Sequence, residues 1–432
     1  MKRQKFQTPT GMHDILSEEQ KYFQRIYDVC ENLANFYGFK KIETTILEET
    51  ELFSKGIGFS TDIVGKEMYS FRTKGGDYLS LRPEGTAPVV RAYVEHGMQN
   101  LPQPVKLWYF GPFFRYEKPQ MGRFRQHHQF GFEVFGEENP VVDAQIIQIF
   151  YNILRELKLK NLIIEINSIG DSQCRPYYKK LLVSYFKSRV MALCTDCRRR
   201  LRENPLRILD CKEEKCQRII AGAPQMINHL CEECHKHFKE VLEFLDEINL
   251  PYRLNPYLVR GLDYYTKTVF EIFSEVSQKE GSSELVVRNA LAGGGRYDAL
   301  VKLLGGKDTS ALGGAAGIER IIALLKEKPI RFKEAIAPQI YLAQLGNLAK
   351  RKSLKLVEDF RLGKIPIGES LGRDSLKAQL KMADKMKVKY ALILGQKEAL
   401  EGTIIIRDMA NGRQETVKFE KVVREMKKML KK

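Results

Sequence analysis

One segment of the sequence, residues 114–136 ("FRYEKPQMGRFRQHHQFGFEVFG"), places charged and amide side chains at alternating positions. Successive side chains of a β-strand point to opposite faces of the sheet, so Arg115 and Glu117 share one face of a first strand. Gln129 and Glu133 share one face of a second strand by the same rule. Such a polar floor suits a ligand with both anionic and hydrogen-bonding parts, whereas the alternative is an ordinary solvated sheet face.

The same segment predicts a hairpin with a long loop. If the chain reverses near Met121, residue Arg115 lies opposite His127, and Phe113 lies opposite Gln129. The polar residues of both strands then line one sheet face. The loop between the strands is also basic, with Lys118, Arg123 and Arg125.

A second charged segment, "RGLDYYTKTVFE" (residues 260–271), places Arg260 and Asp263 beside two tyrosines and just before an apolar alternation. Charges in such a position are costly to bury unless they are paired or bind a charged ligand. An Arg–Asp ion pair and a ligand site both remain open. No nucleophile elbow, zinc helix or standard phosphate loop occurs in the sequence. The pattern therefore favours phosphoryl handling by arginines over nucleophilic catalysis.

Six of the eight cysteines fall within a short stretch and are arranged in pairs. Cys194 and Cys197 form one C-x-x-C, Cys211 and Cys216 follow, and a second C-x-x-C comes later; the later pair is Cys231 and Cys234. In a cytoplasmic protein such pairs favour metal or redox use over a disulfide framework. The first four cysteines give the most local set of ligands for a structural zinc, and His235 or His237 could also contribute. The alternative is ordinary free thiols.

Charge and hydropathy narrow the class of protein. The chain has 432 residues and a formal net charge of +17, and residues 337–432 carry 22 Lys plus Arg against 11 Asp plus Glu. This excess favours a polyanion such as nucleic acid, although a lysine-rich solubilising tail would look the same. No apolar run approaches the ~20 residues that span a bilayer, and no apolar segment follows the basic N-terminus. We therefore expect a cytoplasmic protein with no membrane segment.

The order of expected elements gives the fold class, a mixed α/β (α+β) protein. Helical spacing of apolar residues predicts helices at about 18–37 and 141–157 and, near the C-terminus, at 348–362. A charged, helical, cysteine-rich insertion is expected at about 171–250 inside a larger domain, residues 1–330. Residues 337–432 alternate strand and helix and form a small α/β domain.

Several of these segments, in order along the chain, resemble one enzyme family. The segment 114–136 resembles motif 2 of class II aminoacyl-tRNA synthetases, and "GGAAGIERIIALL" resembles motif 3. The segment 260–271 resembles the signature of the histidyl-tRNA synthetase family, as do "TGMHDIL" and "LRPEGTAPVVRAYVEHG". "GESLGRDSLKAQLKMADKM" is similar to its C-terminal anticodon-binding domain. The resemblance covers essentially the whole chain and implies a mainly antiparallel catalytic sheet flanked by helices.

The resemblance implies roles for particular residues. The catalytic residues would be Arg115 and Arg260: Arg115 would grip the α-phosphate of ATP and the histidine carboxylate, and Arg260 would contact the α-phosphate as charge builds there. ATP would be held by Arg115, Glu117, Arg123 and Arg320. Histidine would be held by Glu84, Thr86, Arg115, Gln129, Glu133, Arg260, Tyr264 and Tyr265. It also implies Mg²⁺ as a cofactor and a homodimer.

The implied activity is ATP-dependent activation of L-histidine, followed by its transfer to the 3′ end of tRNA(His). Two positions depart from the family pattern: Thr45 stands where motif 1 usually has proline, and His127 stands where a phenylalanine stacks on adenine. Two alternatives are a non-catalytic regulatory subunit of histidine biosynthesis and a tRNA-binding protein without ligase activity. Regulatory subunits typically lack the anticodon domain and the Arg260 signature, and a tRNA-binding protein leaves motifs 2 and 3 unexplained.

Overall fold

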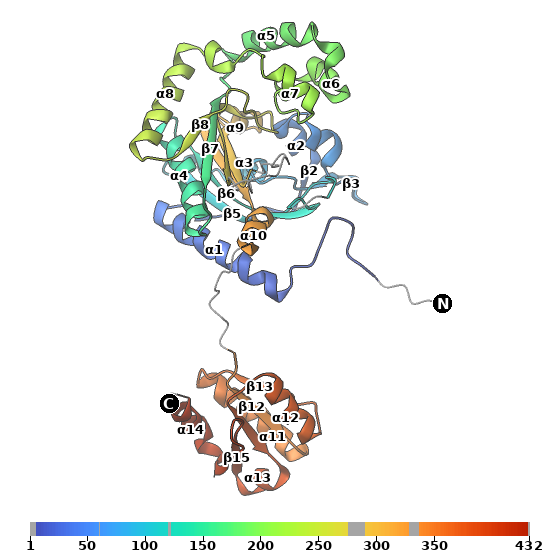
Figure 1. The fold of residues 1–432 in the computed structure, drawn as a ribbon, viewed down its shortest axis with the longest axis vertical. Coiled ribbons are helices and arrows are strands. Elements are labelled where there is room, and N and C mark those ends of the chain that lie inside the picture. The colour runs from blue at the N-terminus through green and yellow to red at the C-terminus, as the bar shows by residue number, and fades with distance from the viewer. Residues whose placement is uncertain (1–5, 60, 120–121, 275–289, 328–336, 431–432) are drawn as a thin grey trace, which may run out of the picture. The chain divides into compact units, whose positions relative to one another are not determined.

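The computed structural model describes residues 6–59, 61–119, 122–274, 290–327 and 337–430 (Figure 1). The chain forms two compact units, Met1–Ile330 and Arg331–Lys432. Within the described ranges, no helix combines the length and the apolar character needed to cross a membrane.

The first unit is built on an eight-stranded sheet in the order β1-β5-β6-β11-β10-β9-β7-β8. Adjacent strands of this sheet are antiparallel, except for the β1–β5 and β7–β8 pairs, which are parallel. The strands are β1 (Lys40–Lys41), β5 (Val105–Phe114), β6 (Gln126–Phe135), β7 (Leu162–Ser168), β8 (Tyr252–Leu254), β9 (Thr266–Ser274), β10 (Ala292–Arg296) and β11 (Ala311–Gly317).

The predicted hairpin forms, but its predicted register is wrong by two residues. Phe113 of β5 pairs with His127 of β6, and Gly111 pairs with Gln129. A shift of two residues leaves every side chain on its predicted face, because the strand period is also two. Arg115 lies just beyond β5, where its backbone N–H donates to the carbonyl of Arg125 at 2.8 Å. The reversal predicted near Met121 lies outside the described residues.

Two helical layers cover the sheet. The layer that packs on Phe130 and Phe132 consists of α1 (Ser17–Tyr37), α4 (Val141–Glu156), α8 (Glu232–Glu247) and α10 (Ile318–Lys326). Side chains of the opposite face pack against α2 (Thr50–Ile57), α3 (Thr86–Glu95) and α9 (Leu300–Leu303). Gln129 and Glu133 alternate with the two phenylalanines and so point toward this second layer. The helices predicted at 18–37 and 141–157 are confirmed.

The remaining elements of the first unit lie around this framework. The segment between β7 and β8 is helical and contains α5 (Arg175–Lys187), α6 (Thr195–Glu203) and α7 (Glu214–Ile220) before α8 returns the chain to the sheet. Short helical turns occur at Ile63–Glu67, Met98–Asn100, Val190–Ala192, Pro205–Ile208 and Met226–His229. A small antiparallel sheet has the order β2-β4-β3, with β2 (Leu47–Glu49), β3 (Ser70–Arg72) and β4 (Tyr78–Leu81).

The second unit is a small α/β domain with its own core. Its five-stranded sheet has the order β13-β12-β14-β15-β16. The strands are β12 (Ile340–Gln344), β13 (Ile367–Glu369), β14 (Tyr390–Leu394), β15 (Thr403–Asp408) and β16 (Gln414–Lys418). The helices are α11 (Asn347–Leu362), α12 (Leu376–Lys385), α13 (Gln396–Glu401) and α14 (Val422–Met429), with a short turn at Phe419–Lys421. The helix predicted at 348–362 and the mixed α/β fold class are confirmed.

Candidate active site

A polar cleft of about 490 Å³ opens at the ends of β5 and β9, between the hairpin and the insertion. It brings together five charged residues that the sequence predicts for this site: Arg115, Glu117, Arg123, Arg260 and Arg320. Motifs that are about 200 residues apart in the chain therefore meet at one surface. The insertion supplies part of the wall, including residues of α6 and of the segment after it.

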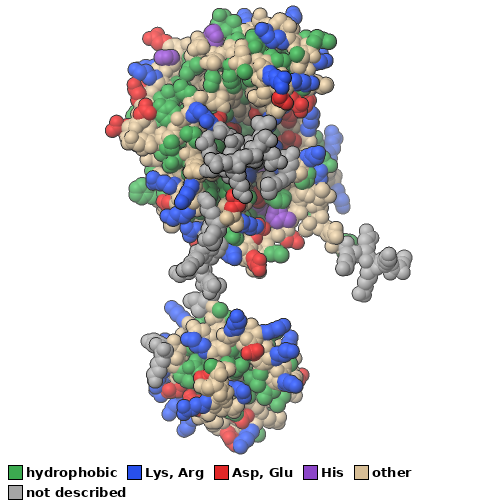
Figure 2. Space-filling model, in the orientation of Figure 1, with side chains coloured by type: hydrophobic (Ala, Val, Ile, Leu, Met, Phe, Trp, Pro, Cys, Tyr) green, Lys and Arg blue, Asp and Glu red, His purple; other side chains and the backbone are tan. Residues whose placement is uncertain are grey.

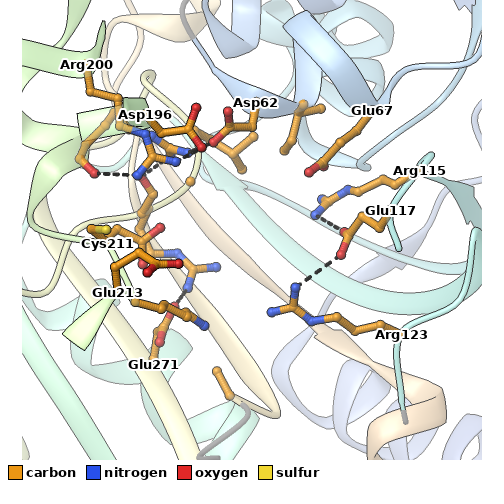
Figure 3. A pocket seen from close by; sticks show the side chains of 18 of the residues that line it. Asp62, Glu67, Arg115, Glu117, Arg123, Asp196, Arg200, Cys211, Glu213 and Glu271 are labelled. Carbon is orange, nitrogen blue, oxygen red and sulfur yellow. Dashed lines mark hydrogen bonds and ion pairs between the residues drawn. The ribbon is translucent and has the colours of Figure 1, made fainter. Parts of the chain in front are cut away.

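The hairpin side of the cleft carries a small charge network. Glu117 lies between two guanidinium groups, 3.8 Å from Arg115 Nη1 and 3.2 Å from Arg123 Nη1 (Figure 3). Arg115 Nε donates to the carbonyl oxygen of Pro83 at 2.8 Å, which fixes the arginine against the turn before α3. On the insertion side, Arg200 donates to Asp62 at 2.6 Å (Figure 3). Both walls of the cleft therefore carry arginines paired with carboxylates.

Arg260 lies half-buried in this cleft and is paired with a carboxylate. Its Nη1 donates to Glu271 of β9, and its guanidinium carbon lies 5.8 Å from the centre of the Tyr265 ring. A Cβ at Gly293 of β10 would meet Arg260 Nη1 at 2.6 Å. Gly293 therefore makes room for the Arg260 side chain, because any larger residue at this position would push against the guanidinium. For Asp263, the structure shows its Oδ1 accepting from Asn204 at 2.9 Å.

Arg320 contributes an additional positive charge at the start of α10. Its Nη1 donates to the carbonyl of Ala290 at 2.7 Å. Burial lowers the pKa of Arg320, and the charge of Arg123 lowers it further. Positive groups gathered this closely indicate a site suited to an anion.

A buried cluster of carboxylates and hydroxyls adjoins the cleft. Glu84 accepts from the backbone N–H groups of Thr86 and Ala87, both at 2.7 Å, at the start of α3. Thr86 Oγ1 donates to Glu133 at 2.8 Å, and Tyr297 OH donates to the other oxygen of Glu133 at 2.5 Å. Burial raises the pKa of Glu133 to about 8. Two buried carboxylates held only by neutral donors are suited to a cationic ligand, because a positive charge would stabilise their ionised forms.

Aromatic side chains close this cluster. Tyr264 OH donates to Glu84 at 3.3 Å, and the Tyr264 and Tyr265 ring centroids lie 4.6 Å apart. Gln129 and His127 face an adjoining part of the cleft, which they share with Arg260. Burial lowers the pKa of His127 to about 3, so its imidazole is neutral near pH 7. All the residues selected for binding thus line either the cleft or the cluster beside it.

The cysteines form two groups rather than one. The Sγ atoms of the four cysteines selected as zinc ligands lie within 4.8 Å of one another, and these are Cys194, Cys197, Cys211 and Cys216. Cys194 and Cys211 have an Sγ–Sγ distance of 3.8 Å, which matches the edge of a tetrahedron with Zn–S bonds of about 2.3 Å. Cys231 and Cys234 belong to a separate group with Asp171 and Cys174. As found within the described parts of the chain, neither group includes His235 or His237.

Four residues of these sites were missed by sequence reasoning: Glu271, Tyr297, Asp171 and Cys174. Glu271 gave one usable signal, because it is an acidic residue inside the apolar run "TVFEIF". Tyr297 follows a glycine-rich strand, where nothing in the local pattern indicates a contact with Glu133. Asp171 and Cys174 are only three residues apart, a spacing that resembles half of a metal site.

Comparison with known proteins identifies the family. The family model described as Histidyl-tRNA synthetase matches residues 11–321, and a model described as Anticodon binding domain matches residues 339–429. The chain belongs to the histidyl-tRNA synthetase family. The family resemblance and the class II catalytic architecture predicted from sequence are thereby confirmed, together with the C-terminal anticodon-binding domain.

Relatives within the histidyl-tRNA synthetase family are similar over almost their full lengths. A histidine–tRNA ligase of Dehalococcoides mccartyi is 42% identical over 425 residues, covering 98% of this chain and 100% of the relative. One from Desulfitobacterium hafniense is 45% identical over 420 residues, covering 96% and 97%. The crystal structure of apo histidyl-tRNA synthetase from S. aureus has a TM-score of 0.77 at 35% identity, covering 98% of this chain and 99% of that one.

Proposed function

We propose that this chain is a histidine–tRNA ligase, which activates L-histidine with ATP and transfers it to the 3′ end of tRNA(His). The proposal rests on one observation: an arginine-lined cleft directly adjoins a buried cluster of carboxylates. An open cleft lined by Arg115, Arg123, Arg260 and Arg320 suits polyphosphate, and the adjoining cluster around Glu84 and Glu133 suits an ammonium group.

In this proposal the cleft binds ATP. Arg115 grips the α-phosphate, while Arg123 and Arg320 hold the γ-phosphate end. Glu117, which lies between Arg115 and Arg123, accepts from the adenine amino group. Arginine suits this role because its planar guanidinium donates to two oxygens at once.

The adjoining cluster binds the substrate histidine. Glu133, Gln129 and Glu84 provide acceptors for its α-ammonium group, with Thr86 holding Glu133 in place. Tyr264 and Tyr265 enclose the imidazole ring. Burial raises the pKa of Glu133 to about 8, so this carboxyl is protonated at neutral pH in the free protein. The arriving cation displaces that proton and pairs with the carboxylate.

The first step needs no protein nucleophile. A carboxylate oxygen of histidine attacks the α-phosphorus of ATP in line, forming histidyl-adenylate, and pyrophosphate leaves with the electrons of the broken P–O bond. Arg260 and Arg115 stabilise the charge that builds on the α-phosphate oxygens. Mg²⁺, when bound, neutralises phosphate charge, and Glu271 is a carboxylate of the cleft that fits such a hard cation. Burial raises the pKa of Glu271, and a metal ion would favour its ionised form.

In the second step the terminal 3′-hydroxyl of the tRNA attacks the carbonyl carbon of the adenylate, and AMP leaves. The C-terminal unit is the part of the chain that binds the anticodon. Lys and Arg side chains are spread over the visible face of this unit (Figure 2), and residues 337–432 contain 22 of them against 11 acidic residues. Such a surface binds a polyanion through release of its counterions.

Histidine-dependent ATP–pyrophosphate exchange tests the proposal directly. The ligase exchanges labelled pyrophosphate into ATP only when L-histidine is present, and it then charges tRNA(His). A regulatory subunit or a plain tRNA-binding protein gives no exchange. Absence of exchange from the folded protein with Mg²⁺ present would rule out the ligase.

A truncation separates the two steps. Removing residues 337–432 should leave exchange detectable but greatly weaken tRNA charging, because the anticodon contact is lost. Binding of tRNA by the full chain should fall as salt is added. Unchanged charging by the truncated protein would contradict a tRNA-binding role for this unit.

The proposal has three further parts. The chain acts in the cytoplasm, and it functions as a homodimer, as the family resemblance implies. A structural zinc ion is held by Cys194, Cys197, Cys211 and Cys216. The four converging sulfur atoms support this zinc site.

A further inference from the structure

The geometry points to a second structural metal site, in which Asp171, Cys174, Cys231 and Cys234 hold a zinc ion. One ligand atom from each residue lies within 4.8 Å of the other three. Cys174 and Cys234 are buried, whereas Asp171 and Cys231 are half-buried. This group shares no residue with the four cysteines of the first site.

The donor set is suited to zinc. Three sulfur atoms and one carboxylate oxygen complete a tetrahedral shell, and thiolates select zinc over Mg²⁺ or Ca²⁺. Asp171 is oriented toward this shell by its own turn, since its Oδ1 accepts from the backbone N–H groups of Gln173 at 2.9 Å and Cys174 at 3.2 Å. Cys174 Sγ in turn accepts from the backbone N–H of Cys231 at 3.0 Å. Backbone N–H donors to sulfur are the kind of surrounding contact that stabilises a metal-bound thiolate.

The group lies where the two ends of the insertion meet, so a metal ion there would join them. Asp171 and Cys174 lie between β7 and α5, where the chain leaves the central sheet, and Cys231 and Cys234 lie at the start of α8, which returns it. Cys174 and Cys231 are 57 positions apart in the chain. A metal that joins them closes the base of the insertion, and cross-links that close long loops remove much conformational freedom from the unfolded chain. The first cysteine group lies within this closed loop and fixes its far part.

The same group is connected to the proposed histidine pocket through Arg175. Arg175 follows Cys174 directly, and its guanidinium donates to the backbone carbonyls of Ile169, at 3.2 Å, and of Tyr265. Tyr265 is one of the aromatic residues expected to enclose the imidazole. A metal at the base of the insertion therefore also steadies one wall of the substrate pocket.

Metal stoichiometry tests the site without reference to catalysis. Full-length protein purified without chelator and measured by plasma mass spectrometry should hold two zinc ions per chain. Cys231→Ser with Cys234→Ser should lose one of them, and Cys197→Ser with Cys216→Ser should lose the other. The control is Cys30→Ser, which lies in α1 away from both groups and should keep both ions. Zinc content equal to wild type in the Cys231/Cys234 variant would overturn the proposal.

Asp171→Asn addresses the chance that the double variants fail to fold. Asparagine keeps an Oδ1 acceptor for the turn but removes the anionic oxygen that would bind the metal. This variant should keep its secondary structure and should release one zinc ion to a chelator at least about tenfold faster than wild type. Release at the wild-type rate, or an intact mass that shows a disulfide in place of the metal, would overturn the site.

Discussion

The open arginine-lined cleft and the buried carboxylate cluster lie side by side but differ in charge and in exposure to solvent. The cleft holds its positive groups in partial contact with solvent and balances them with carboxylates such as Glu117 and Glu271. The cluster removes Glu84 and Glu133 from solvent and gives them only neutral donors. The two regions are therefore suited to ligands of opposite charge, the cleft to an anion and the cluster to a cation.

This contrast has a kinetic consequence. In the proposed reaction the charge on the α-phosphate changes as the transition state forms, so we expect contacts in the cleft to act mainly on kcat. The α-ammonium group of histidine keeps its charge throughout, so we expect contacts in the proposed histidine-binding cluster to act mainly on the KM for histidine. Substitutions in the cleft and in the cluster should therefore change different kinetic constants.

Replacing Arg260 should reduce the rate of adenylation most. Arg260→Gln should lower kcat for pyrophosphate exchange by about 10²–10³-fold, because a donor to the developing charge is lost. The KM for histidine should change little. Steady-state exchange kinetics measure both. The matched control is Arg200→Gln, whose guanidinium is engaged with Asp62 on the insertion wall and should affect kcat far less. Near-normal kcat in the Arg260 variant would contradict its role.

Neutralising Glu133 should act on binding instead. Glu133→Gln keeps the shape of the side chain but removes the charge that pairs with the ammonium group. The KM for histidine should rise about 10- to 100-fold, corresponding to about 1.5–3 kcal/mol for a hydrogen bond to a charged group. Glu138→Gln, which changes an exposed carboxylate nearby, should leave KM unchanged. A fall in kcat with an unchanged KM would reverse the proposed division between the two regions.

The pH dependence of histidine binding should identify the same carboxylate. Burial raises the pKa of Glu133 to about 8, so the free protein holds a proton there at neutral pH. Binding of the ammonium group expels that proton, and affinity should therefore rise as the pH rises, about tenfold per unit, and level off above pH 8. The imidazole of the substrate titrates in every variant, so the readout is wild type against Glu133→Gln. Parallel profiles, measured by calorimetry, would exclude Glu133 as the titrating group.

The smallest effect is expected at His127, which lines the cleft where we propose that adenine stacks. A phenylalanine offers more stacking area than a neutral imidazole, so His127→Phe should lower the KM for ATP by about two- to tenfold, or about 0.5–1.5 kcal/mol. The KM for histidine should not move. His96→Phe, at an exposed position, is the control. An increased KM for ATP would mean that His127 makes a specific polar contact with the nucleotide.

Much of the cleft could be predicted from the sequence, because the relevant patterns are local. The alternation that places Gln129 and Glu133 on one face follows from strand geometry alone. The predicted face was therefore correct even though the predicted register was wrong by two residues. Each of the motifs that contain Arg115, Arg260 and Arg320 is a continuous stretch of sequence, so each could be recognised separately. Their family also implied that they meet, which composition and spacing alone do not establish.

The types of side chain, the strand faces on which they lie and the family of the chain could all be inferred from the order of residues. The partners of these side chains became known only from the fold: Glu271 for Arg260, Tyr297 for Glu133, and Asp171 with Cys174 for the second C-x-x-C. The physical reason is that these pairs are made by strand pairing and by closure of long loops. Sequence spacing predicts which residues share a face within one element. It carries no record of which elements the fold brings together.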